Sequence, residues 1–117
     1  MPEAVVAPHL TLSIQRTEDG AIVRCSGRLV SGVNSTLYSK VSQLIPGSKR
    51  IVLDLTELTH MDSMGLGTLV RLYISAKSSG CSLELVNIGK QIQQLLSLTN
   101  MLSVFTIIGE QGGIVRF

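Results

Sequence analysis

The strongest constraint on this chain is an alternation of short apolar runs and amphipathic stretches between residues 51 and 108. Three of the apolar runs have the length and composition of β-strands: 51–55 (IVLDL), 83–86 (LELV) and 104–108 (VFTII). Apolar residues at helical spacing predict a helix over 64–78 and a shorter helix around 92–96. A strand–helix–strand–helix–strand order predicts two crossover connections and a largely parallel sheet.

The residues before this alternation predict a different strand arrangement. Residues 10–14 alternate between apolar and polar side chains, and residues 21–27 (AIVRCSG) form a second apolar run after the turn signal Glu18-Asp19-Gly20. These two strands are expected to form an antiparallel hairpin. A helix is predicted over 33–45, where Pro46-Gly47 ends it. The predicted fold class is α/β, with an antiparallel hairpin leading into a parallel half and helices packed on the sheet.

Composition restricts the class of function. A chain of 117 residues with 44% hydrophobic and 15% charged residues is expected to form one domain over residues 1–117, with a well-developed core. The net charge is +2, the Lys and Arg residues are scattered, and aromatic residues make up 3%, which argues against direct nucleic-acid binding. No apolar run is long enough to insert in a membrane, and no secretory signal is recognisable. We therefore expect a soluble, cytoplasmic protein.

Residues that could support enzymatic chemistry are few. Cys25 and Cys81 lie in apolar stretches and are expected to be buried, reduced thiols. His9 and His60 lie far apart in the sequence, and neither has neighbours at metal-ligand spacing. The sequence GLGTLV begins like a dinucleotide-binding fingerprint, but Val70 stands where the third glycine belongs. We expect no catalytic residue, no metal site and no cofactor.

Residues 56–67 are the most informative segment, and we interpret them as the link between the strand 51–55 and the helix that follows. Asp62 and Ser63 stand where a helix N-cap belongs, and the simplest interpretation of Ser63 is a cap worth about 1 kcal/mol. For Asp62, capping and partner recognition are both open. Gly65 and Gly67 each cost up to about 1 kcal/mol relative to Ala within a helix. Two such glycines indicate close approach by either a neighbouring strand or a partner.

These residues carry a resemblance to a known family. The segment 53–88, LDLTELTHMDSMGLGTLVRLYISAKSSGCSLELVNI, resembles the centre of the STAS domain, which occurs in bacterial anti-sigma factor antagonists and in the tails of sulphate transporters. Asp62, Ser63, Gly65 and Leu66 match the family pattern Asp-Ser-x-Gly-Leu between a strand and a helix. The resemblance extends over about residues 9–109, with a short atypical C-terminal tail beyond.

The resemblance implies a function based on protein binding. In the antagonist class, the serine matching Ser63 is phosphorylated, which implies the same modification here. The unmodified domain would bind an anti-sigma factor, usually a serine kinase, and a serine phosphatase would restore the phosphorylated form. The protein would then be no enzyme but a substrate and a protein ligand. The alternative is a STAS accessory or scaffold subunit of a signalling complex or lipid-transport system, with no switch at this serine.

We expect the partner surface to be centred on Ser63. It would include the flanking residues and one cation of the following helix: Met61, Asp62, Met64, Gly65 and Arg71. A phosphate on Ser63 would be favourable at a helix N-terminus and unfavourable inside a docked interface.

The sequence departs from the family in three places. Gly27-Arg28-Leu29-Val30 replaces the Gly-Glu-Leu-Asp of many antagonists, which reverses the local charge. Arg28 and Val30 therefore favour the accessory-subunit alternative. Met64 stands where Ser or Thr is frequent. Nine residues follow Ile108, where the family usually has an amphipathic helix. We expect 110–113 to form a turn and 114–117 (IVRF) to form either a brief edge strand or a free tail. A free tail would promote a homodimer.

Overall fold

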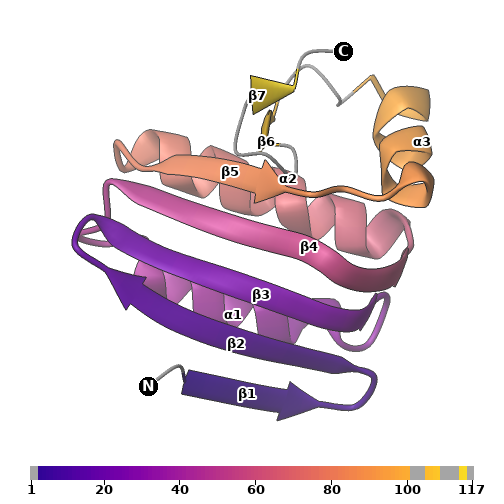
Figure 1. The fold of residues 1–117 in the computed structure, drawn as a ribbon, viewed down its shortest axis with the longest axis horizontal. Helices are drawn as coiled ribbons and strands as arrows, with labels where there is room; N and C mark the ends of the chain where they lie inside the picture. The colour runs from indigo at the N-terminus through magenta and orange to yellow at the C-terminus, as the bar shows by residue number, and fades with distance from the viewer. Residues whose placement is uncertain (1–2, 101–104, 109–113, 116–117) are drawn as a thin grey trace.

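The computed structural model describes residues 3–100, 105–108 and 114–115. Figure 1 shows the elements in chain order: β1 (Glu3–Ala7), β2 (Leu10–Thr17), β3 (Gly20–Leu29), α1 (Asn34–Leu44), β4 (Arg50–Met61), α2 (Ser63–Ser78), β5 (Ser82–Val86), α3 (Lys90–Leu98), β6 (Thr106–Ile108) and β7 (Ile114–Val115).

One sheet holds all seven of these strands in their sequence order, β1 to β7. Both β1–β2 and β2–β3 pair antiparallel, the four strands β3 to β6 run parallel, and β7 is antiparallel to β6. Helices α1 and α2 connect successive parallel strands and lie together behind the sheet in Figure 1. The predicted α/β fold, with an antiparallel hairpin and a parallel half, is confirmed.

The core lies between the sheet and these helices. The alternate residues of β2 to β5 that face the helices are buried, among them Leu12, Val23, Leu53 and Leu85. The helices contribute the matching apolar faces, with Leu37 and Val41 from α1 and Leu69 and Leu72 from α2. Burial of these aliphatic side chains is the main term that fixes both helices on one face. Cys25 and Cys81 are both buried, as predicted.

The opposite face of the sheet carries two ion pairs. Arg24 lies 3.5 Å from Asp54, and Arg50 forms a bidentate ion pair with Glu84 at distances of 2.8 to 3.0 Å. An antiparallel sheet commonly leaves one face to solvent, and here that pattern extends across the parallel strands.

Two strands differ from the sequence prediction. Strand β1 was not predicted, because its five residues are too few to show a pattern. Strand β4 continues to Met61, so the prediction of a link from residue 56 was wrong. Its second half pairs with β3 up to Leu29↔Met61 through two register shifts. Those shifts place Leu58 and Met61 inward at a spacing of three rather than two, so the alternation typical of a strand is absent.

The end of the chain is described only in part. Phe105 is buried and packs edge to face on Tyr73, with ring centroids 5.4 Å apart. Ile114 and Val115 form β7 against β6, so for these two residues the prediction of an edge strand is confirmed. Val104, the predicted turn 110–113 and Phe117 lie outside the described residues. In the part that the structure describes, no helix is long and apolar enough to cross a membrane.

Candidate partner-binding site

Ser63 is the first residue of α2, immediately after β4. The N-cap is Asp62, whose Oδ1 accepts a 2.9 Å hydrogen bond from the backbone N–H of Gly65. The interpretation of Ser63 as the cap was therefore wrong, and capping by Asp62, one of its two alternatives, is confirmed. Asp62 fills the capping role, and Ser63 is exposed at the first position of the helix.

Asp62 also joins two elements. Its Oδ2 accepts a 2.9 Å hydrogen bond from the backbone N–H of Ser31, in the loop between β3 and α1. These two N–H groups, that of Ser31 first and that of Gly65 second, lower the pKa of the Asp62 carboxyl below its ordinary value. Asp62 is thus a carboxylate at neutral pH, and it places a negative charge beside Ser63.

The two glycines of α2 lie in different surroundings. A Cβ at Gly65 would overlap the carbonyl oxygen of Leu29 and come within 2.8 Å of Met61 Cγ. The predicted close approach is confirmed at Gly65, and the neighbour is strand β3. A Cβ at Gly67 would meet no atom within 4 Å. No neighbouring strand explains Gly67, although it costs about 1 kcal/mol relative to Ala within the helix.

The other predicted contact residues divide by exposure. Met64 is 53% exposed, and Arg71 is exposed with its guanidinium 4.1 Å from the ring centroid of Tyr38 on α1. Met61, by contrast, is 7% exposed and belongs to the core. Placing the Met61 side chain on the partner surface was therefore wrong, because it fills the space between β3 and the first turn of α2. Gly65 is buried with it.

Sequence reasoning missed two residues that border this site, Ser31 and Tyr38. Both follow β3, whose carboxyl end lies beside that of β4 in the parallel pair. A helix between two strands, as predicted over 33–45, indicates such a parallel pairing. The carboxyl ends of neighbouring parallel strands meet at one edge of the sheet. The site therefore spans the β3–α1 loop as well as the β4–α2 junction.

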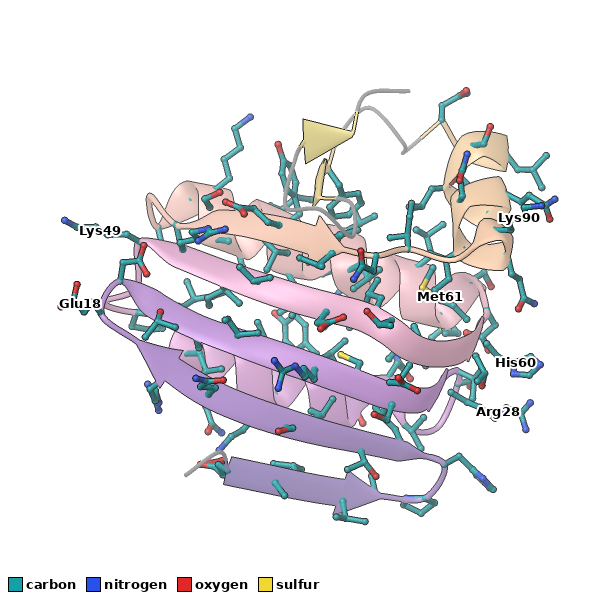
Figure 2. The ribbon with its side chains drawn as sticks, viewed as in Figure 1. Glu18, Arg28, Lys49, His60, Met61 and Lys90 are labelled. Carbon is teal, nitrogen blue, oxygen red and sulfur yellow. The ribbon has the colours of Figure 1, made fainter. Side chains whose placement is uncertain are left out.

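Basic side chains lie at the same end of the molecule. Figure 2 shows Arg28 and His60 projecting side by side, with Lys90 at the same end, whereas Glu18 and Lys49 lie at the opposite end. Arg28 and His60 are register partners of β3 and β4, and both are exposed. Arg71 lies midway along α2 and Lys77 in its last turn, Lys40 of α1 is paired with Glu3, and neither helix contains Asp or Glu. Among the described residues, no cluster of three or more His, Cys, Asp or Glu could hold a metal ion.

At this end of the molecule an exposed serine begins a capped helix, an exposed methionine follows it, and Arg28 and His60 lie at the same end. The family model for the STAS domain matches residues 11–111. The chain belongs to the STAS domain family. The exposed serine of this STAS domain occupies the Asp-Ser-x-Gly-Leu position noted in the sequence.

Known proteins similar to this STAS domain include anti-sigma factor antagonists. The anti-sigma-B factor antagonist of Bacillus subtilis is 23% identical over 108 residues, which cover 92% of this chain and 99% of the relative. An anti-sigma factor antagonist from Mycobacterium paratuberculosis has a similar fold, with a TM-score of 0.75, 19% identity and coverage of 88% of this chain and 89% of that one. The unphosphorylated form of the anti-sigma factor antagonist SpoIIAA gives a TM-score of 0.73 at 16% identity, covering 86% and 90% of the two chains.

Proposed function

We propose that this STAS domain is an anti-sigma factor antagonist that binds an anti-sigma factor while Ser63 is unphosphorylated and is switched off by phosphorylation of Ser63. The observation that carries the proposal is the exposure of Ser63 at the first position of α2, with Asp62 as the cap. A hydroxyl that is not needed for capping is free to accept a phosphate.

The fold is expected to tolerate that phosphate. A phosphoserine carries about −1.5 to −2 charges at neutral pH. At a helix N-terminus such charge is favourable by about 0.3–1 kcal/mol, which opposes its repulsion from the Asp62 carboxylate. In a docked interface the same dianion must lose its hydration, and this cost falls on the complex rather than on the fold.

The partners follow from the same proposal. The anti-sigma factor would be of the serine-kinase type and would itself phosphorylate Ser63, and a serine phosphatase would reverse the modification. The Bacillus subtilis relative is by name an antagonist of an anti-sigma factor, and a SpoIIAA structure in the phosphorylated form is also similar in fold, with a TM-score of 0.68. In this role the protein acts in the cytoplasm as a kinase substrate and a protein ligand rather than as an enzyme.

The test uses purified serine-kinase-type anti-sigma factors from the genome that encodes this chain. We expect Ser63→Ala to bind one of them as wild type does, and Ser63→Asp and the phosphorylated protein to bind weakly, all with unchanged thermal unfolding. Ser78→Asp is the matched control, because Ser78 is exposed at the other end of α2. Equal binding by the Ala, Asp and phosphorylated forms would overturn the switch.

One observation favours a second candidate, an accessory or scaffold subunit without a switch. The exposed Arg28 stands where many antagonists carry an acidic residue, and Val30 replaces a second acid. Incubation of the protein with the same kinases and ATP separates the two candidates. Phosphate incorporated at Ser63 supports the antagonist, and its absence with every kinase supports the accessory subunit.

A further inference from the structure

Gly67 occupies a half-exposed helical position at which no contact within the fold requires a glycine. It lies in the second turn of α2, four residues after Ser63, so the two residues are neighbours on the same helix face. A side chain there would meet no atom within 4 Å, and its φ is not among the positive values of the chain. A glycine that weakens a helix without serving its own fold is explained by something that approaches the helix from outside.

The face around Gly67 is apolar along α2 and cationic at its borders. Met64 is 53% exposed and Ile74 is 57% exposed, at three and seven positions from Gly67 on the same face. Arg71 stacks on Tyr38, which draws its side chain toward α1 and away from the glycine. The space beside Gly67 is therefore open, and the exposed side chains of Met64 and Ile74 lie before and after it along the helix.

The charge of this face indicates what fits it. The α1–α2 layer carries Lys40, Arg71 and Lys77 and no carboxylate, and Arg28 lies at the end where α2 begins. Of these, Lys40 is paired with Glu3. Asp62 is the nearest acid in the chain sequence, and its two oxygens accept backbone hydrogen bonds from Ser31 and Gly65.

We infer that Gly67 is the point of closest approach for an acidic, amphipathic segment of the partner protein, which lies along α2 between Met64 and Ile74. Its apolar side chains contact these two residues, and its carboxylates face Arg71 and Arg28. Carboxylates complement this positive face, whereas a second copy of this chain would bring helices without any acid to it. The inference rests on the proposed function, because docking here places the partner over Ser63.

The experiment compares wild type with Gly67→Ala, Gly67→Leu and the control Ser78→Leu. Gly67→Ala is expected to raise the midpoint of thermal unfolding by about 2–5 °C, because alanine favours the helix. Gly67→Leu is expected to weaken binding to the anti-sigma factor at least about tenfold, with Ser78→Leu within about twofold of wild type. Unchanged binding by Gly67→Leu, or a lower unfolding midpoint for Gly67→Ala, would overturn the inference.

Failure of the proposed function is distinguishable from failure of this inference. If wild type binds no anti-sigma factor, the proposed function falls, and two synthetic amphipathic helices, one flanked by Glu and one by Lys, then test the face directly. The Glu peptide is expected to shift the amide signals of Met64, Gly67 and Ile74 in wild type but not in Gly67→Leu. An equal response to both peptides, or no response to the Glu peptide, would contradict an acidic partner segment.

Discussion

The backbone N–H of Ser31 donates a 2.9 Å hydrogen bond to Oδ2 of Asp62, 31 residues further along the chain. The other oxygen of the same carboxylate caps α2 through the N–H of Gly65. One side chain therefore fixes the loop after β3 to the first turn of the helix that carries Ser63. Any change at Asp62 is expected to loosen both ends of this junction.

Asp62→Ala is expected to lower the free energy of unfolding by about 1–2 kcal/mol at neutral pH, through loss of the cap and of the second hydrogen bond. Because the pKa of Asp62 is lowered in the folded state, its charge stabilises the fold above the ordinary carboxyl pKa of 3.8. This contribution is lost as the pH falls below 3.8 and through the lower folded-state pKa.

Urea unfolding of wild type, Asp62→Ala and Asp62→Asn at a series of pH values measures this dependence. Asn retains part of the capping ability but has no charge, so its difference from wild type should shrink as the pH falls through that window. Glu18→Gln serves as the control, since Glu18 lies at the opposite end of the molecule in Figure 2. A difference between Asp62→Asn and wild type that stays constant down to acid pH would contradict the role of the charge.

Gly65→Ala is expected to destabilise the fold by about 1–3 kcal/mol, because the added methyl group overlaps the Leu29 carbonyl oxygen and crowds Met61. Those contacts are backbone and core atoms that yield little. Gly67→Ala is the matched comparison two residues further along the same helix, where space is open. The denaturant midpoints of the two variants should move in opposite directions, and a parallel shift would show that the surroundings of the two glycines do not differ as described.

Gly65 and Gly67 also show which features of the site could be predicted from the sequence. The sequence predicted a close approach to both glycines. Only the packing of β3 against α2 shows that the strand lies against Gly65 and not against Gly67. The order of strands and helices from residue 10 onward was predictable, because each carries a clear hydrophobic period. The second half of β4 was not, because its register shifts remove that period. The choice between Asp62 and Ser63 as the cap also depended on geometry that the sequence does not contain.

Cys25 is expected to resist alkylation in the folded protein. It is 1% exposed, and burial, with a smaller effect from the charge of Asp54, raises the pKa of its thiol to about 12. Since the thiolate is the reactive form, Cys25 should react with iodoacetamide at pH 8 only as fast as the protein unfolds. Mass spectrometry of a Cys81→Ser variant, with and without denaturant, follows Cys25 alone. Rapid labelling without denaturant would contradict the buried position.

Strand β7 is expected to protect the edge of the sheet. It pairs with β6 through Ile107↔Val115 and Ile108↔Ile114, so β6 has a neighbour on both sides. A chain that ends at Glu110 lacks β7 and leaves the backbone groups of β6 open on one side, as an edge that favours pairing with another molecule. Sedimentation should show a monomer for the full chain and self-association for the shortened one. If the full chain itself sediments as a dimer, a second copy of the chain contributes to covering this edge of the sheet. If the shortened chain remains monomeric and equally stable, β7 does not protect the edge.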